Sequence, residues 1–355
     1  MSDDERLKAH IRAGGPLTIA QYMTWRLHDP VEGYYAARPA LGEDGDFITA
    51  PLVSQMFGEL LGLWAVAAWR GLGSPGQVIL AEAGPGDGTL MSDALRAARL
   101  DPAFLAAAEL CLIETSPVLR QVQAERLGGG PLQPRWLSAV GELPEHAPLI
   151  LIANELLDCL PAHQFVRSES GWAERMVGLN DKDALAFGLS RRPMDSMMPE
   201  ADPGQVVEQS PAQEAFGGEL GAVLARQGGA ALIIDYGRGR PGLGDTLQAL
   251  KRHAKVSPLE PGADLTIHAD FPAVAAAARA AGANCAPLLT QGEFLRRLGV
   301  FERAAALAQA RPDRAQTLQR QLARLTDADQ MGDLFKVLAI YAPAGPVPPG
   351  FEEPV

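Results

Sequence analysis

The chain has 355 residues, of which 47% are hydrophobic and 21% charged, a composition typical of a globular protein with one large or two modest domains. Its formal net charge is −12, and no Lys- and Arg-rich run is present to neutralise phosphates, so we expect no nucleic-acid partner. An acidic surface suits a cationic substrate, although many cytosolic proteins are acidic only for solubility.

The cysteines and the start of the chain indicate in which cell compartment the protein is found. Cys111, Cys159 and Cys285 lie far apart without metal-ligand spacing, which argues against a disulfide framework and against a metal site. The acidic start does not resemble a secretory signal or a transit peptide, and the apolar stretch 60–69 is too short to cross a bilayer. We therefore predict a cytoplasmic protein without membrane insertion.

The Pro-rich segment 343–355 is expected to be a flexible tail without a packed partner.

The N-terminal part of the chain has helical periodicity at 18–27 and 51–69, with a loop rich in Gly, Pro and Asp between these segments. We assign 1–70 to a helical and loop region that covers the active site.

Short apolar runs alternate with helical segments in the following part. These runs read QVILAEAGPGDG (77–88), ELCLIETSP (109–117), PLILIANELLD (148–158) and GGAALIIDYG (228–237). Such alternation predicts a parallel sheet with helices on both faces, and the carboxyl ends of its strands are where ligands bind.

Two further segments complete the expected architecture. Residues 162–226 alternate in polarity and contain turn signals, which favours antiparallel strands inserted between the parallel ones. Helices are expected at 269–281 and 291–325, followed by a closing strand at 333–342. The predicted fold is α/β, with a Rossmann-like domain formed by 71–160 and 228–342 and an inserted α+β substrate-binding region at 161–227.

The segment from Glu82 to Gly88 carries the clearest local signal, E-A-G-P-G-D-G between an expected strand and an expected helix. Its glycines let the backbone approach a ligand, and the helix start offers free N–H groups. In a dinucleotide fingerprint a glycine would stand at Thr89, so the spacing disfavours a nicotinamide-dependent oxidoreductase. The loop alone could also be a simple tight turn.

Acids follow the other strands. Glu114 ends the second run, where a carboxylate can accept hydrogen bonds from ribose hydroxyls, although it could also be a solvated surface residue. Asn154, Glu155 and Asp158 end the third run; Asn154 could equally cap a helix that begins at Glu155. Asp235 ends the fourth run and could be a wall of the pocket or a loop residue.

Long segments along the chain resemble the MidA-like methyltransferases, bacterial relatives of the mitochondrial arginine methyltransferase that assists complex I assembly. The similarity covers about 15–342 and includes the segments GPLTIAQYM, DPVEGYY, GDFITAPLVSQMFGELLGLW, LAEAGPGDGTLMSD, IETSPVLRQVQ, IANELLDCLPAHQF, IIDYG, DTLQALKRH, PGADLTIHADF, QGEFLRRLG and MGDLFKVL. This chain departs from the family pattern at Asp87, where a basic residue is common, and at Leu156 and Leu157, where an aromatic pair is common.

The resemblance implies a class I fold that binds S-adenosyl-L-methionine (SAM). The residues that we assign to the cofactor are Glu82, Gly84, Pro85, Gly86, Gly88, Glu114, Asn154, Tyr34, Gly45, Asp46, Phe47, Thr49, Ser54 and Gln55. Among them, the N-terminal segment is implied to border the active site, and Ser54 and Gln55 to close over the cofactor.

The resemblance also implies a substrate, an arginine of a protein that is a subunit of respiratory complex I. Because a guanidinium stays protonated, carboxylates must hold it. The candidates are Glu155 and Asp158, with Asn154, Glu208 and Asp235 beside them. The apolar face at 60–69 could pack internally or between the chains of a homodimer. A non-catalytic assembly factor and a small-molecule methyltransferase stay open as alternatives.

Overall fold

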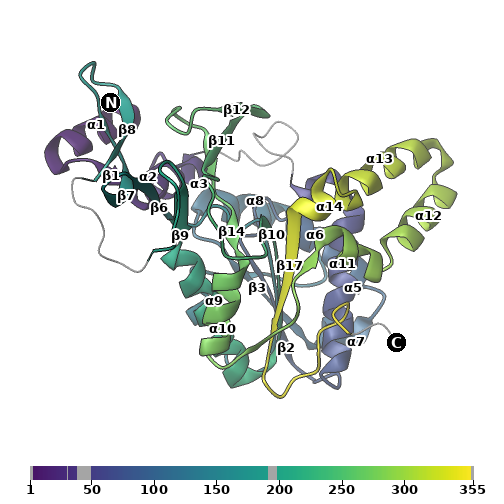
Figure 1. The fold of residues 1–355 in the computed structure, drawn as a ribbon. Coiled ribbons are helices and arrows are strands. Elements are labelled where there is room, and N and C mark those ends of the chain that lie inside the picture. Colours follow the sequence, from purple (N-terminus) through teal and green to yellow (C-terminus); the bar gives the residue numbers. More distant parts are fainter. Residues whose placement is uncertain (1–2, 30, 38–48, 191–197, 353–355) are drawn as a thin grey trace.

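A large mixed sheet forms the centre of the computed structural model, which describes residues 3–29, 31–37, 49–190 and 198–352 (Figure 1). Its strand order is β15-β17-β10-β5-β2-β3-β4, with β14 paired to β10 and β16 to β17. The strands are β2 Val78–Ala83, β3 Ala108–Ile113, β4 Arg135–Leu137, β5 Leu149–Asn154, β10 Gly229–Arg238, β14 Ala269–Asp270, β15 Asn284–Cys285, β16 Leu289–Thr290 and β17 Phe335–Tyr341. The strands from β10 to β4 are parallel, and β17 is antiparallel to β10.

The central strands are apolar along their whole length because both faces of the sheet are covered. All six residues of β2 and of β5 are buried. Leu80 packs into the core on one face, whereas its neighbours Ile79 and Ala81 pack into the core on the other. The predicted parallel sheet with helices on both faces is thereby confirmed.

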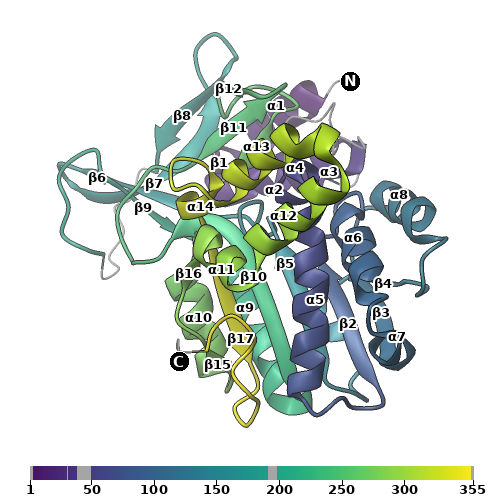
Figure 2. The same ribbon diagram turned by 90° about the vertical axis from the view of Figure 1, so that its right-hand side faces the viewer.

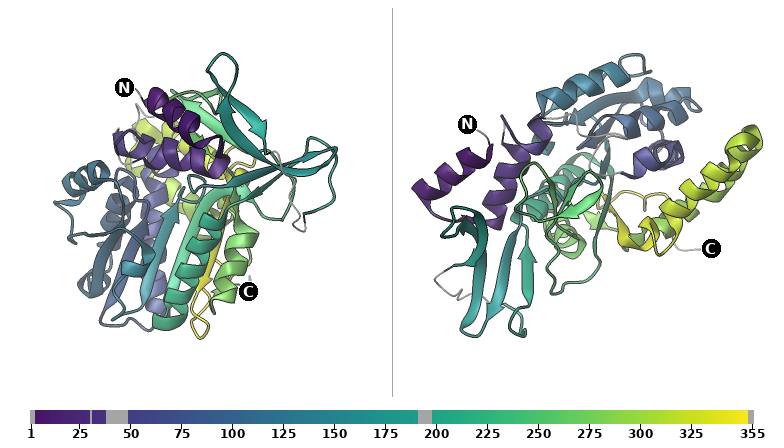
Figure 3. Two further views of the ribbon diagram at one scale, coloured as in Figure 1. Left: turned by 90° about the vertical axis from the view of Figure 1, so that its left-hand side faces the viewer. Right: turned by 90° about the horizontal axis from the view of Figure 1, so that it is seen from above.

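Each face has its own helices. Figures 2 and 3 show α5 (Gln55–Gly71), α6 (Thr89–Ala98), α11 (Gln291–Arg297) and α12 (Val300–Ala310) toward one side, and α9 (Pro211–Gln227) and α10 (Phe271–Ala280) on the other. A Cβ atom on Gly221 of α9 would lie 2.7 Å from the Ala278 carbonyl oxygen of α10, so the two helices touch. Helix α9 therefore belongs to the helical layer of the central sheet, although the sequence placed it in the inserted region.

The remaining helices lie at the margins of these layers. They are α4 Ala50–Val53, α7 Pro102–Ala107, α8 Pro117–Leu127, α13 Ala315–Thr326 and α14 Met331–Leu334, with the short 3-10 turns Val140–Glu142 and Pro312–Arg314. None of the helices that the structure describes combines the length and the apolar character needed to span a bilayer.

A second sheet joins the N-terminal region to the insertion. Its order is β1-β7-β6-β9, with β8 on β7, formed by β1 Leu17–Thr18, β6 His163–Ser168, β7 Gly171–Leu179, β8 Leu185–Leu189 and β9 Val206–Gln209. Strand β1 leads into α2 (Ile19–His28), which follows α1 (Asp3–Gly14) and precedes α3 (Tyr34–Ala37). The N-terminal helices and this sheet gather at one end of the central sheet (Figures 1 and 3).

A third, small sheet contains β11 Gln248–Lys251, β12 Ala254–Val256 and β13 Asp264–Thr266, in the order β12-β11-β13. The sequence analysis placed this stretch within the Rossmann-like domain and did not anticipate a separate sheet. It packs with α1 and α2 in one hydrophobic cluster that includes Tyr22, Leu27, Ala249 and Leu265. Helices α1 to α3 and the third sheet thus form one continuous unit, which we call the cover.

The C-terminal segment packs against the body, contrary to expectation. The indole N–H of Trp64 donates a hydrogen bond to the carbonyl of Pro349 at 3.1 Å. Phe351 is 6% exposed, and its ring lies 5.4 Å from that of Phe294. Burial of these rings outweighs the high proline content, so the prediction of a tail without a packed partner is wrong.

Candidate active site

The site lies where the winding of the central sheet changes direction. From β2 the chain moves outward to β3 and β4, and it then returns to place β5 on the other side of β2. In open α/β sheets the crevice between two such strands, at their carboxyl ends, is the usual ligand site.

A cavity of about 790 Å³ opens at this position, within the range of small-molecule sites. Its walls come from the N-terminal region, the ends of four central strands, α9 and the third sheet. The lining residues are Thr24, His28, Tyr35, Thr49, Pro51, Leu52, Glu82, Ala83, Gly84, Pro85, Gly86, Asp87, Leu90, Ile113, Glu114, Thr115, Leu119, Ser138, Ala139, Val140, Asn154, Glu155, Leu156, Asp158, Cys159, Leu160, Pro161, Ala212, Ala215, Phe216, Glu219, Tyr236, Asp264 and Thr266.

The glycine loop after β2 forms one wall. Gly84 has φ +68°, a conformation that other residues rarely adopt, so the backbone here favours glycine; a Cβ atom would also approach the end of the Leu156 side chain to 2.9 Å. Asp87 accepts a hydrogen bond from the Thr89 N–H at the start of α6 and pairs with Arg126 at 2.8 Å. The acid that departs from the family pattern is therefore neutralised by a neighbouring helix.

Glu82 lies beneath this loop and is 2% exposed. Its Oε2 atom is buried without a hydrogen-bond partner among the described residues. Burial, reinforced by the charge of Asp87, raises the pKa of Glu82 to about 8. A buried carboxyl oxygen without a hydrogen-bond partner is energetically unfavourable. A cationic ligand group that donates a hydrogen bond to it would remove this cost.

Glu114 lines the cavity at the end of β3 and is 8% exposed. Its Oε1 atom accepts a hydrogen bond from the Ser116 N–H at 2.7 Å, and Oε2 accepts one from Gln123 at 3.3 Å. Burial raises the pKa of Glu114, and the hydrogen bonds oppose the rise. Gln123, which is fully buried, also donates to the Gly86 carbonyl at 2.8 Å, so this unpredicted residue ties the acid to the glycine loop.

The chain makes an irregular turn after β5. Glu155 has φ +53°, and residues 155–160 are not helical, so the alternative in which Asn154 caps a helix is wrong. The Glu155 N–H donates to the Ile234 carbonyl at 2.8 Å, and its Oε1 atom accepts from the Ala50 N–H and the Asn154 amide, both at 3.0 Å. A glutamate rarely adopts a positive φ, so the surrounding contacts must hold Glu155 in this conformation. Such strained backbone conformations are common at functional sites.

Asp235 supports this turn from below. It is fully buried and accepts hydrogen bonds from the N–H groups of Leu157 at 2.8 Å and Asp158 at 3.2 Å. Burial, with the charges of Asp158 and Glu155, raises the pKa of Asp235 well above its usual value. Asp235 is not among the lining residues, so it positions the turn and does not form a wall of the cavity.

Glu155 and Asp158 both face the cavity. Burial and the charge of Asp158 raise the pKa of Glu155 to about 8. Burial also raises the pKa of Asp158, to about 6, while a hydrogen bond with Tyr236 opposes the rise. Two like charges close together in a poorly hydrated site favour protonation unless a cation binds between them.

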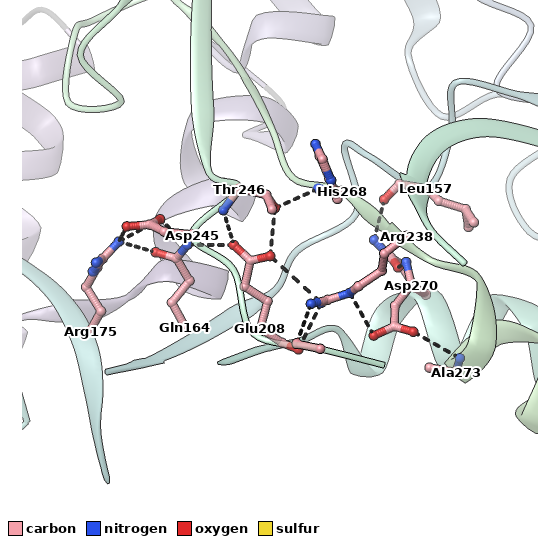
Figure 4. A network of polar contacts seen from close by, with 12 residues as sticks. Leu157, Gln164, Arg175, Glu208, Arg238, Asp245, Thr246, His268, Asp270 and Ala273 are labelled. Atoms are coloured by element: carbon pink, nitrogen blue, oxygen red, sulfur yellow. Dashed lines mark hydrogen bonds and ion pairs between the residues drawn. The ribbon is translucent and has the colours of Figure 1, made fainter. Parts of the chain in front are cut away.

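Glu208 lies outside this cavity, in the polar network of Figure 4. It is 5% exposed and accepts hydrogen bonds from Gln164 at 2.8 Å, the Thr246 N–H at 2.7 Å and the Thr246 hydroxyl at 2.6 Å. Arg238 lies 3.8 Å from Glu208 and 3.3 Å from Asp270. The geometry gives Glu208 a structural role that links the inserted sheet to β10.

Other predicted cofactor residues are distributed unevenly. Thr49 and Pro85 line the cavity, whereas Gly88 begins α6 with φ +81°. Tyr34 is buried behind Tyr35, which does line the cavity. The Ser54 side chain caps α5 by accepting from the Met56 N–H, and Gln55 donates to Glu59; neither lines the cavity. Gly45, Asp46 and Phe47 lie outside the described residues.

Several lining residues were missed by the sequence assignment of the site. Asp264 and Thr266 belong to the unexpected third sheet, and Phe216 and Glu219 to α9. His28 was not assigned to the site from the sequence, yet it lines the cavity and its Nε2 atom contacts the Cys159 carbonyl at 3.1 Å. Only the family segment PGADLTIHADF could have pointed to Asp264, since no local pattern distinguishes it.

Most ionisable side chains that line the cavity are acids. Its described lining includes the acids Glu82, Asp87, Glu114, Glu155, Asp158, Glu219 and Asp264 and includes neither Lys nor Arg. A site of this kind favours cationic groups.

Comparison with known proteins agrees with the geometry. Residues 60–288 match the family described as "Putative S-adenosyl-L-methionine-dependent methyltransferase". The "Protein arginine methyltransferase NDUFAF7 homolog, mitochondrial" of Drosophila melanogaster is 35% identical over 374 residues, which cover 95% of this chain and 84% of that protein. The human protein arginine methyltransferase NDUFAF7, mitochondrial, is 33% identical, over 93% of this chain and 81% of its own length.

A solved structure is similar as well. A Burkholderia thailandensis protein, crystallised with S-adenosyl-homocysteine, superposes with a TM-score of 0.85 at 29% identity and covers 99% of this chain and 93% of that chain. The resemblance read from the sequence is thus confirmed, and its cofactor is SAM. The chain belongs to this family of SAM-dependent methyltransferases, and it is an enzyme built on their Rossmann-like fold.

Proposed function

We propose that this enzyme transfers a methyl group from SAM to a guanidinium nitrogen of an arginine in a protein. The observation that carries the proposal is the continuous cavity between the glycine loop and the turn with Glu155 and Asp158, whose described lining has acids and no Lys or Arg. Relatives named as protein arginine methyltransferases support the same acceptor.

The cofactor end of the cavity fits SAM. The buried Oε2 atom of Glu82 lacks a partner, and Gly84 leaves space that a side chain would fill. In this proposal Glu82 binds the ammonium of the methionine part, the N–H groups near Gly86 face its carboxylate, and Glu114 binds the ribose hydroxyls. When bound, SAM supplies an electrophilic methyl group on a sulfonium.

The acceptor end fits a guanidinium. This group is planar, stays protonated at working pH and presents five N–H donors. Glu155 and Asp158 bind it and orient one nitrogen toward the methyl group, while Asn154 adds an amide beside them. Positioning of the reacting atoms can supply most of the acceleration of such a displacement.

The proton balance of the reaction falls on the same acids. As the nitrogen–carbon bond forms and the sulfur–carbon bond breaks, the guanidinium nitrogen must lose one proton. Glu155 is the best acceptor, because a pKa of about 8 makes its carboxylate more basic than an ordinary one. Asp235 keeps the turn in place through the Leu157 and Asp158 N–H groups.

The finer expectations on partners also belong to this proposal. On the family resemblance, the acceptor is a subunit of respiratory complex I, and on the sequence, the enzyme is cytoplasmic. The apolar face at 60–69 packs into the core, with Leu60, Leu61 and Trp64 at most 3% exposed. A homodimer through this segment would have Leu63, 36% exposed, as its apolar contact.

A single experiment tests the proposal. The purified enzyme is incubated with methyl-labelled SAM and a lysate of the source cells, and labelled proteins are digested and analysed for methylated arginine. We expect label on arginine with the wild type and with Glu214→Gln, an exposed acid of α9 away from the cavity lining. Label confined to small molecules, or on residues other than arginine, would contradict the proposal.

A further inference from the structure

A third acid reaches the acceptor end of the cavity from the cover. Asp264 on β13 lines the same cavity as Glu155 and Asp158 and is 8% exposed. Its Oδ1 atom accepts a hydrogen bond from the Tyr35 hydroxyl at 3.3 Å. The acids of this end therefore come from two layers, the central sheet and the cover.

Tyr35 is itself fixed by its neighbours. Its ring stacks on His28 with centroids 5.8 Å apart and meets the edge of Tyr34 at 5.2 Å. His28 contacts the carbonyl of Cys159, the residue that follows Asp158 in the turn. One chain of contacts thus connects the turn, the aromatic rings and Asp264, which places the third acid in a defined position.

The acids of the two layers affect one another. Burial raises the pKa of Glu155 and of the Cys159 thiol, and the charges of Asp158 and then Asp264 add to both shifts. Carboxylates gathered around a cavity without a lining Lys or Arg in the described chain repel one another. A cationic ligand relieves that repulsion.

We propose that Asp264 binds the acceptor guanidinium together with Glu155 and Asp158, and that Tyr35 is a positioning residue for Asp264. This inference rests on the proposed arginine methylation. Its consequence is that the acceptor pocket is completed only by the cover. A guanidinium, with donors spread over three nitrogens, can bind carboxylates from both layers, whereas the compact ammonium of lysine matches such a divided site less well.

Calorimetry with a defined probe tests the inference. The enzyme saturated with S-adenosyl-homocysteine is titrated with N-acetyl-arginine amide and, separately, with the uncharged citrulline analogue. The variants are Asp264→Asn and Tyr35→Phe. The matched control is Glu260→Gln, an exposed acid near the same small sheet that pairs with Lys251 at 3.0 Å.

We expect Asp264→Asn to weaken arginine binding by about 10- to 100-fold, since it removes a charge-assisted contact. Tyr35→Phe should weaken it by about threefold, and the control should have no effect. Binding of the citrulline analogue and of S-adenosyl-homocysteine should be the same in all variants, which a general loss of structure would not allow.

Two opposite outcomes are distinguishable. If Asp264→Asn binds the arginine probe as the wild type does, this inference is wrong while arginine methylation stands. If the wild type does not distinguish arginine from citrulline, the proposed function fails and the inference fails with it. Should Asp264→Asn also lose S-adenosyl-homocysteine, Tyr35→Phe decides, because it leaves the carboxylate in place and removes only its hydrogen bond: selective weakening of the arginine probe supports the role, and unchanged binding contradicts it.

Discussion

The cofactor end and the acceptor end of the cavity are built differently. At the cofactor end, Glu82 lies near the end of β2 and Glu114 directly follows β3, and Glu114 accepts from an N–H only two residues away. At the acceptor end, Glu155 accepts from Ala50, 105 residues away in sequence, and Asp264 accepts from Tyr35, 229 residues away. Neighbouring strands and helix α8 fix the first end, and contacts with the N-terminal region and the third sheet fix the second.

This difference has a consequence for the behaviour of variants. A change at the cofactor end should alter SAM binding and leave the acceptor site intact, because Glu114 and the glycine loop are supported by α8, which does not support the turn after β5. A change at the acceptor end should spare the cofactor and affect the acceptor, the cover or both. The following experiments test whether the two ends separate in this way.

The largest effect is expected for Glu155→Gln. The amide keeps an oxygen for the Ala50 N–H but removes the charge that binds the guanidinium and accepts its proton. We expect kcat/KM for the protein acceptor to fall by about 100- to 1,000-fold, the range for loss of one partner of a buried charge pair. The assay measures methylarginine at a pH above about 8, where Glu155 is ionised in the wild type.

The control for this variant is the affinity for S-adenosyl-homocysteine, which should stay within about twofold by calorimetry. A parallel loss of cofactor binding would show that the two ends are not separable. Full activity with normal cofactor binding would show that Glu155 does not bind the acceptor.

Glu82→Gln should produce the next largest effect, now at the cofactor end. The orphaned Oε2 atom has no other partner in the described chain, so loss of its charge removes a contact that only the ligand makes. We expect about 10- to 100-fold weaker SAM binding, because hydrogen bonds to charged groups contribute about 1.5–3 kcal/mol. Acceptor binding at saturating S-adenosyl-homocysteine should not change.

The pH dependence of cofactor binding sharpens this prediction. The pKa of Glu82 is raised to about 8 in the free enzyme, so at lower pH the carboxyl is protonated and must lose its proton to bind an ammonium. SAM affinity should therefore rise with pH up to about 8 and level off above it. Calorimetry across that range should give a flat profile for Glu82→Gln; an equal slope in the variant would assign the titration to another group.

The same contrast explains what the sequence could predict. The apolar runs, the glycine loop, Glu82 and Glu114 are short-range features, because a buried parallel strand and a glycine turn each leave a local pattern. The family resemblance and the Rossmann-like fold followed from these segments and are confirmed by the comparisons.

The features that the sequence did not predict depend on contacts between residues that are far apart in the chain. A helix beginning at Glu155 stayed an alternative because these residues have no helix-breaking pattern. The positive φ of Glu155 instead accompanies contacts with Ile234 and Ala50. Asp264 lies in a short strand whose partners are known only from the fold. Glu208 looked like a site residue because an isolated acid in sequence does not reveal its hydrogen-bond partners.

Asp235→Asn should produce an intermediate effect that falls on the acceptor end and on stability. Both carboxyl oxygens of Asp235 accept hydrogen bonds from backbone N–H groups. An asparagine keeps one of these oxygens and replaces the other with an NH2 group, which cannot accept a hydrogen bond. We expect the free energy of unfolding to fall by about 2 kcal/mol, since a buried donor loses its acceptor. Urea denaturation measures this, with the exposed Asp313→Asn as control; a stable variant with normal acceptor binding would contradict the supporting role.

The smallest effect is expected for Glu208→Gln, although the sequence placed this acid among the site candidates. The glutamine oxygen can still accept from Gln164 and the Thr246 N–H. Its amide can donate to the Thr246 hydroxyl, which then turns its own hydrogen elsewhere. The distant pair with Arg238, at 3.8 Å, is the main contact that is lost.

We therefore expect Glu208→Gln to reduce the free energy of unfolding by about 1 kcal/mol and to leave kcat and the acceptor KM unchanged. Thermal unfolding and the methylarginine assay on the same preparation measure both quantities. Because a network with internal partners does not need a ligand, the acid at Glu208 should behave oppositely to the orphaned acid at Glu82. Loss of methyl transfer in a folded Glu208→Gln enzyme with normal SAM binding would return Glu208 to the acceptor site and extend that site into the inserted sheet.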